Sequence, residues 1–410
     1  MRRKQYFFII LILGALSTIS PFSIDMYLPG FPAIAQSLGT SLDKVGLSLT
    51  SYLVGISIGQ LIYGPLLDRY GRKKPVYVGL IIYIIASLGC ALTASVHALI
   101  FMRFLQAIGG CVGLVAAQAL VRDLFPVNKT AQAFSLLVLV IAISPMIAPT
   151  VGGYVTTGFG WQYVFIILAG ITLVILACIY FILPEGKKAD SSISLKPKAV
   201  LKNFYEVLKQ PQFLIYAVSG GIATAGPFAY IVGSPGVFMN IYGLNEKQYG
   251  WIFGLLAFSV IGSTQLNHLF LKKFKSEQII KVTLRCQSTV GVFLVTGSWL
   301  GWFDLYSLII VMFIFLIGQG LIGPNANALS LAPFTKHAGS AAALLGAFRM
   351  GMGGIVSATV SVLHNNTAIP MLGGMAFCAL AGLYILAVGK TTVRYRASRR
   401  EVEEESSVLL

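Results

Sequence analysis

Residues 64–74 have the sequence Gly64-Pro65-Leu66-Leu67-Asp68-Arg69-Tyr70-Gly71-Arg72-Lys73-Lys74. This polar and mostly basic segment separates two apolar runs, 45–66 and 75–96. Each run has about the 20 residues that an α-helix needs to cross the hydrocarbon core of a bilayer. A short charged turn between two such runs indicates a pair of membrane-spanning helices.

The same pattern continues on both sides of this pair. Of the 410 residues, 56% are hydrophobic and 11% are charged, whereas a soluble domain has about 25% charged residues. We therefore predict an all-α integral membrane protein with twelve transmembrane helices. The apolar runs lie near 6–30, 45–66, 75–96, 98–120, 131–157, 161–183, 212–238, 248–271, 279–300, 305–328, 338–362 and 368–389.

The formal net charge of +16 comes mainly from the loops and the chain ends. If the N-terminus is cytoplasmic, nearly all basic loop residues lie on the cytoplasmic side, and only Lys44 and Lys247 lie outside. Basic residues are enriched in the cytoplasmic loops of membrane proteins. Both termini are thus predicted to be cytoplasmic, and the positive charge does not require a nucleic acid partner.

A Lys- and Ser-rich stretch, 184–211, separates six apolar runs from six. Asp43-Lys44 and Glu246-Lys247 open the second run of each half, which suggests a duplication. Transporters are commonly built from such repeats, with the substrate site between them. We predict an N-terminal six-helix bundle at 1–183, a cytoplasmic linker at 184–211, a pseudo-symmetric C-terminal six-helix bundle at 212–389 and a cytoplasmic tail at 390–410.

Asp25 is the one acidic residue of fourteen that lies inside an apolar run, away from loops, tails and helix ends. An acid inside the membrane is costly, so it is a functional candidate that faces the bundle interior or a water cavity. Burial disfavours its charged form and a nearby cation favours it, so such an acid can exchange a proton near neutral pH. The alternative is a structural acid that caps a helix broken near Pro29.

Arg103 is a buried cation at a similar depth. Asp25 and Arg103 each lie about six residues, or roughly 9 Å, from the external ends of their runs. The two side chains are therefore expected to share one cavity and to form a proton-coupling pair. The alternative for Arg103 is a structural guanidinium that bonds backbone carbonyls.

The segment 64–74 resembles the signature loop of the major facilitator superfamily, and helix number, topology and central loop agree over the whole chain. The resemblance implies a cytoplasmic gate in which Asp68 and Arg72 hold the halves together. Its residues would be Gly64, Asp68, Arg69, Gly71 and Arg72. The corresponding turn of the second half, 271–278, lacks the glycines and the acid at matching places.

The first apolar run resembles one particular family within this superfamily. Residues 23–32, Ser-Ile-Asp-Met-Tyr-Leu-Pro-Gly-Phe-Pro, closely resemble the bicyclomycin and chloramphenicol resistance (Bcr/CflA) family of drug–proton antiporters. This implies efflux of antibiotics by alternating access in the bacterial inner (plasma) membrane. The implied partners are hydrophobic drugs, protons and the lipid bilayer, for a monomer without cofactor. Residues 103–110 resemble a helix-4 motif of the superfamily in which the arginine is linked to proton coupling.

Helix 5 contains two prolines and two glycines, which bend a helix and expose a smooth backbone face. Pro145, Pro149, Gly152 and Gly153 also resemble the antiporter motif of exporters in this superfamily. The sequence departs from that motif at Ala148, where the family usually has Gly. The alternative is an ordinary kinked membrane helix.

The predicted substrate contacts are polar or aromatic residues within the membrane, because drug pockets are mostly apolar with a few polar anchors. Each could instead bond or pack between helices. Arg349 is expected to bond carbonyls across the second half, with contact to an anionic substrate as the alternative. The predicted contacts are Tyr27, Gln60, Gln106, Phe228, Tyr230, Asn325 and Asn327.

Two other functions stay open. A proton-coupled symporter, or an exporter of a small metabolite such as an amino acid or peptide, would use the same acid. A membrane sensor or enzyme would normally need a soluble domain or a catalytic cluster, and the sequence shows neither. Because Walker-type glycine loops and zinc-ligand spacings are absent, we predict no enzymatic activity, no metal and no cofactor.

Overall fold

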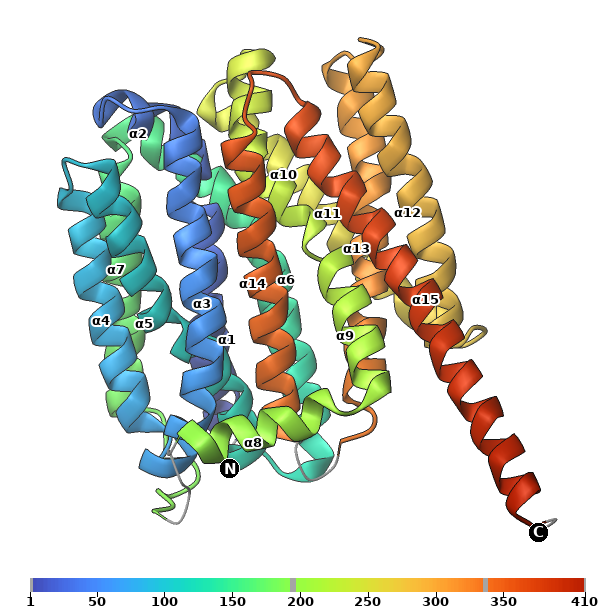
Figure 1. The fold of residues 1–410 in the computed structure, drawn as a ribbon. Coiled ribbons are helices and arrows are strands. Elements are labelled where there is room, and N and C mark those ends of the chain that lie inside the picture. The colour runs from blue at the N-terminus through green and yellow to red at the C-terminus, as the bar shows by residue number, and fades with distance from the viewer. Residues whose placement is uncertain (1–2, 192–196, 335–337, 409–410) are drawn as a thin grey trace.

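The computed structural model describes residues 3–191, 197–334 and 338–408, and within these ranges the chain forms helices and turns without β-strands. Twelve helical segments in this part of the chain are long and apolar enough to cross a membrane. Figure 1 shows them side by side in one bundle. The prediction of an all-α, multi-pass membrane protein with twelve spans is confirmed.

The first half, residues 3–183, contains six spans. Gly71 and Gly160 end the second and fifth of them with φ values of 82° and 102°, which glycine adopts without strain. Span 1 consists of α1 (Arg3–Asp25), the short 3-10 turn η1 (Leu28–Gly30) and α2 (Phe31–Ser37), and spans 2–6 are α3 (Leu42–Tyr70), α4 (Lys73–Leu92), α5 (Val96–Leu124), α6 (Val127–Phe159) and α7 (Gln162–Phe181).

The second half, residues 211–389, contains the other six spans. Side-chain oxygens of Asn245 and Asp304 accept backbone hydrogen bonds at two helix starts, which satisfies otherwise free N–H groups. Span 7 consists of α9 (Pro211–Ala223), α10 (Gly226–Pro235) and the π-helical turn η2 (Gly236–Ile241), and spans 8–12 are α11 (Glu246–Phe270), α12 (Ser276–Trp299), α13 (Leu305–Leu331), α14 (Ala338–Val362) and the first part of α15 (Ile369–Val408).

Span 1 breaks directly after Asp25. Pro29 has no N–H to donate to the carbonyl of Asp25, four residues earlier, and its ring would crowd that carbonyl. The chain turns through η1 and resumes as α2, so span 1 reaches Ser37 and not the predicted end at residue 30. Asp25 therefore lies inside span 1, as predicted, but at the C-terminal end of α1, directly before the break.

Two segments that were predicted as linker and tail contain helix. The linker contains α8 (Pro197–Leu208), and α15 continues past residue 389 to Val408. Figure 1 shows α8 lying across one end of the bundle. Its apolar residues recur at helical spacing, with Val207 buried and Leu201 and Tyr205 exposed.

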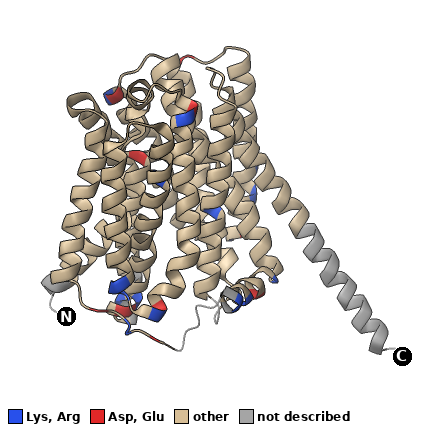
Figure 2. Ribbon diagram, turned by 60° about the vertical axis from the view of Figure 1, so that its left-hand side comes forward, with Lys and Arg blue, Asp and Glu red and all other residues tan. Residues whose placement is uncertain are grey.

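Charged side chains gather at one end of the bundle (Figure 2). The turn between α3 and α4, the C-terminal end of α5 and the first linker residues meet there. We call this end, which contains Arg72, Arg122 and Lys187, the charged end. The end that contains Lys44 and Lys247 is the opposite end.

Candidate functional site

A cavity of about 580 Å³ lies between the two halves at the charged end. The helices α3 and α5 contribute one side, α14 contributes the facing side, and α8 contributes residues between them. Polar and charged groups alternate with apolar groups on its walls. The lining residues include Gln60, Asp68, Gln118, Arg122, Phe204 and Arg349.

Toward the opposite end the halves are in contact. The Ser57 hydroxyl donates to the Ala347 carbonyl at 2.7 Å, and the Thr50 and Ser357 hydroxyls are 2.9 Å apart. These bonds join α3 of the first half to α14 of the second half. The helices α6 and α11 also pack against each other across the boundary between the halves. Since the exposed Arg122 lines the cavity, the cavity is open toward the charged end and closed toward the opposite end.

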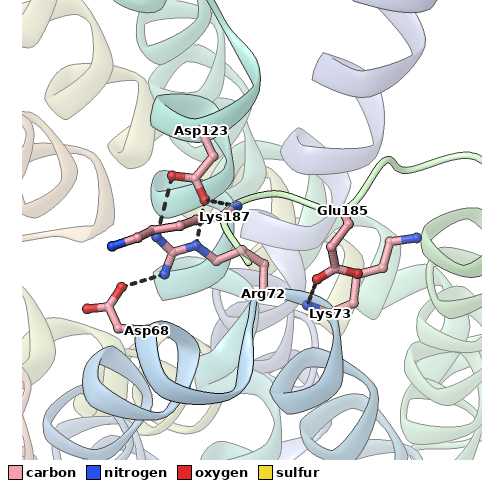
Figure 3. A network of polar contacts seen from close by, with 6 residues as sticks. All are labelled: Asp68, Arg72, Lys73, Asp123, Glu185 and Lys187. Carbon is pink, nitrogen blue, oxygen red and sulfur yellow. Dashed lines mark hydrogen bonds and ion pairs between the residues drawn. The ribbon is translucent and has the colours of Figure 1, made fainter. Parts of the chain in front are cut away.

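Arg72 is the centre of an ion-pair cluster on the cavity wall (Figure 3). Its Nη1 donates to Asp68 Oδ1 at 2.7 Å, and its Nε and Nη2 donate to the two carboxylate oxygens of Asp123 at 2.6 and 3.4 Å. Only 8% of the Arg72 side chain is exposed. Such a planar, two-pronged contact is stronger than a single charge pair.

The start of the linker completes the cluster. The backbone N–H of Lys187 donates to Asp123 Oδ2 at 2.9 Å, and the N–H of Lys73 donates to Glu185 at 3.3 Å. The sequence predicted that Asp68 and Arg72 would hold the two halves together. In this conformation both ion-pair partners of Arg72, Asp68 and Asp123, lie in the first half, so the pair ties α3 to α5 and the linker instead.

The other residues of the predicted gate have different surroundings. A side chain at Gly64 would meet nothing within 4 Å, so this glycine lines the cavity and does not mediate a close helix contact. Gly71 ends α3 with positive φ. Arg69 lies over the ring of Tyr70, at 6.0 Å from its centre.

Arg72→Lys is expected to lower the stability of the folded protein by about 1–3 kcal/mol, because one ammonium group cannot reproduce the forked contact to two acids. The measurement is the thermal unfolding midpoint in detergent. Lys74→Ala is the matched control, since Lys74 is exposed in the same turn. Equal midpoints for the two variants would show that the cluster does not stabilise the fold.

Asp25 is 4% exposed and lies where span 1 breaks. Within the described residues its carboxylate makes no hydrogen bond or ion pair, to Arg103 or to any other group. The turn η1 that follows it contacts α10 and α11 of the second half. The acid thus faces the interface between the halves.

Arg103 is fully buried in the first half. Its guanidinium lies 4.2 Å from the ring centre of Tyr27 and 4.1 Å from that of Tyr52, so the cation is held between two aromatic faces. Its Nη groups donate to the Ser23 carbonyl at 2.8 Å and to Gln106 at 2.5 Å. The structure does not bring Arg103 and Asp25 together as a pair.

Pro145 and Pro149 both lie inside the continuous helix α6. Pro145 cannot bond the carbonyl of Ile141, and the Ser144 hydroxyl donates to that carbonyl instead at 2.7 Å. The polar group freed by the proline is therefore satisfied within the same helix.

Gly152 and Gly153 sit at close contacts on two sides of α6. An added Cβ at Gly152 would collide with the carbonyl oxygen of Met26, in the break of span 1. An added Cβ at Gly153 would lie 2.5 Å from the carbonyl oxygen of Glu246, in the second half. Both glycines are therefore needed for backbone-to-backbone packing, and Gly153 acts where the two halves meet.

Of the predicted substrate contacts, Gln60 lines the cavity. Tyr27 packs on Arg103, and the Gln106 side chain bonds Arg103 and Ser87. Asn325 donates to Asn267 of α11 at 2.7 Å. The structure thus places most of this set between helices.

The remaining predicted contacts are in the second half. Phe228 is buried and faces Gly353, and Tyr230 stacks on Phe253 with ring centres 5.1 Å apart. The hydroxyl of Tyr230 is enclosed without a hydrogen-bond partner in the described structure. Asn327 is half-buried on α13. None of these residues lines the cavity at the charged end.

The sequence did not single out Asp123 or Glu185 as parts of the cluster. Asp123 lies at the end of an apolar run beside Arg122, where an acid next to a basic turn is a weak sign of pairing. Glu185 is one acid in a charged linker. Only the fold brings them within reach of residues 72 and 73.

Comparison with known proteins accounts for this architecture. Residues 13–358 match the Major Facilitator Superfamily. A solved structure of a D-xylose–proton symporter has the same fold, with a TM-score of 0.75 and 16% identity over 93% of this chain and 97% of the other. The chain belongs to the major facilitator superfamily.

Two relatives match nearly the whole chain. A bicyclomycin resistance protein homolog from Haemophilus influenzae is 32% identical over 97% of this chain and 99% of its own length. A chloramphenicol resistance protein from Pseudomonas aeruginosa is 27% identical over 97% of this chain and 93% of its own. Within the superfamily, the chain therefore falls in the Bcr/CflA family, as its helix 1 indicated.

Proposed function

We propose that this protein exports hydrophobic small molecules in exchange for protons, by alternating access. The observation that supports this most is the cavity between the halves, open at the charged end and closed at the opposite end. Such a cavity admits a molecule from one side only. Its volume of about 580 Å³ lies within the range of small-molecule sites.

The bicyclomycin and chloramphenicol relatives suggest antibiotics of that size as substrates. The charged end would face the cytoplasm of a bacterium, because basic loops do so, with both chain ends on that side of the inner membrane. The moving units would be the bundles 1–183 and 212–389, joined by 184–211, with 390–410 as a cytoplasmic tail. We propose that a monomer in the bilayer suffices.

Asp25 would carry the exchanged proton. It is buried, has no ion-pair partner among the described residues, and precedes the turn η1, which contacts α10 and α11 of the other half. Binding or release of a proton by this carboxyl would change its interaction with the second half. A proton can shift the balance between two conformations only if it binds one of them more tightly than the other. Arg103 would act through span 1, since it holds the Ser23 carbonyl two residues before the acid.

The test uses purified protein in proteoliposomes whose charged end faces the bath, with chloramphenicol as the probe. With an acidic lumen, we expect chloramphenicol to accumulate inside, up to about tenfold per pH unit for one proton exchanged against one neutral molecule. A protonophore should abolish the accumulation. Accumulation driven by an acidic bath instead would indicate a symporter, and accumulation without any gradient would contradict proton coupling.

A further inference from the structure

Arg349 lies on the wall of the cavity, in the middle of α14. The cavity residues on α14 that precede it, one to three turns away, are small: Gly339, Ser340, Ala342, Ala343 and Gly346. Small residues leave room for a long side chain to reach into the cavity. Arg349 is the one charged group that α14 contributes to this wall.

The guanidinium of Arg349 lacks a partner in the described structure. Its Nε–H is enclosed and donates no hydrogen bond, and its other nitrogens make no hydrogen bond or ion pair with the described residues. A guanidinium stays charged and offers five donors. An enclosed donor without an acceptor costs about 1–3 kcal/mol, so an acceptor group that enters the cavity would stabilise this arginine.

The acids of the same cavity are already engaged. Asp68 and Asp123 both bind Arg72. Among the described residues, the charged side chains that line the cavity are three arginines and two aspartates, Arg72, Arg122, Arg349, Asp68 and Asp123. The cavity thus carries an excess of positive charge, which favours a negatively charged guest.

The rest of the wall supplies an apolar surface. Leu114 and Val115 of α5, Phe204 of α8 and Met350 of α14 line the cavity beside the arginine. An apolar body could pack against these residues while one anionic group bonds Arg349. Two parallel N–H donors of a guanidinium match the two oxygens of a carboxylate.

We infer that Arg349 is an anion-binding residue of the substrate site, and that the site takes amphipathic organic anions with one carboxylate on an apolar body. The inference rests on the proposed function, because it names the class of molecule that would be exported. It concerns binding from the charged end and requires no proton coupling.

The test is equilibrium binding to detergent-solubilised protein, measured by quenching of ligand fluorescence. The probes are naproxen, an aromatic carboxylate, and its methyl ester, which has nearly the same shape without the charge. We expect wild type to bind naproxen at least tenfold more tightly than the ester. Arg349→Met should remove this preference, a loss of about ten- to hundredfold in naproxen affinity, with ester binding unchanged within about threefold.

Two further variants distinguish a direct contact between Arg349 and the ligand from a general effect of positive charge in the cavity. Arg122→Met removes an exposed arginine of the same cavity and should keep most of the preference for naproxen. Arg349→Lys should keep a part of it, because an ammonium lacks the forked geometry. An equal loss in Arg122→Met and Arg349→Met would overturn the role of Arg349.

Wild type alone can also refute the inference, which protects the test against a variant that does not fold. Equal affinity for naproxen and its ester would refute it. Failure of gradient-driven transport with an intact preference for naproxen would refute the proposed antiport and leave this inference standing.

Discussion

Asp25→Asn is expected to abolish gradient-driven accumulation of chloramphenicol in proteoliposomes, a loss of at least tenfold against wild type. An amide keeps the shape of the carboxyl but cannot bind and release a proton. The acid is buried and has no ionic partner among the described residues, so no other group there is placed to replace it. Binding of chloramphenicol at equilibrium should change less than about threefold, because Asp25 does not line the cavity.

Asp43→Asn is the matched control for this variant. Asp43 is an acid in the first turn of α3, near the same end of the bundle, and the proposal gives it no proton to carry. It should transport like wild type. Full gradient-driven transport by Asp25→Asn would exclude Asp25 as the coupling residue, and equal losses in both variants would point to a general effect of charge.

Gly153→Ala is expected to separate the halves at the opposite end and to slow transport at least tenfold. The new methyl would lie 2.5 Å from the carbonyl oxygen of Glu246 and 3.0 Å from its carbonyl carbon. Both atoms are backbone and cannot turn aside, so α6 and α11 must move apart. Overpacking of this kind costs about 1–3 kcal/mol, which shifts the balance between conformations by about five- to hundredfold.

The measurement is the distance distribution between spin labels at Phe159 and Ile241, two exposed positions in different halves. Gly153→Ala should populate longer distances than wild type. Gly262→Ala is the control, because a side chain at Gly262 of α11 would meet nothing within 4 Å. Unchanged distances in Gly153→Ala would mean that the contact between residues 153 and 246 does not close the opposite end.

The spans could be predicted from the sequence because each carries its own signal, a run of apolar residues of bilayer length. The positions at which helices break within a span depend on individual residues and their hydrogen bonds. Pro29 indicated a break in span 1, but where α1 ends and that α2 follows depend on hydrogen bonds across the turn. α8 was missed because the linker as a whole is polar, while the apolar face of this helix is short.

The candidate site was only partly predictable, because its contacts join residues far apart in the chain. The pair of Asp68 and Arg72 is local, with Asp68 near the end of α3 and Arg72 four residues later in the turn that follows, and was expected. Asp123 lies 51 residues from Arg72, and the Ser23 carbonyl lies 80 residues from Arg103. No periodic pattern encodes such a pairing. The sequence showed that Arg103 is buried, but not that a carbonyl and aromatic rings would be its partners.

The hydrogen bonds that hold the start of the linker to the first half limit how far α8 can move away from that half. The N–H groups of Lys187 and Asp190 bond Asp123 and the Asp68 carbonyl, so the chain is fixed to the first half as far as residue 190. From Asp190 to the start of α8 at Pro197 the backbone reaches about 25 Å at most. Because α8 contacts α14 and α9, any displacement of the second half that carries α8 with it must stay within this tether length.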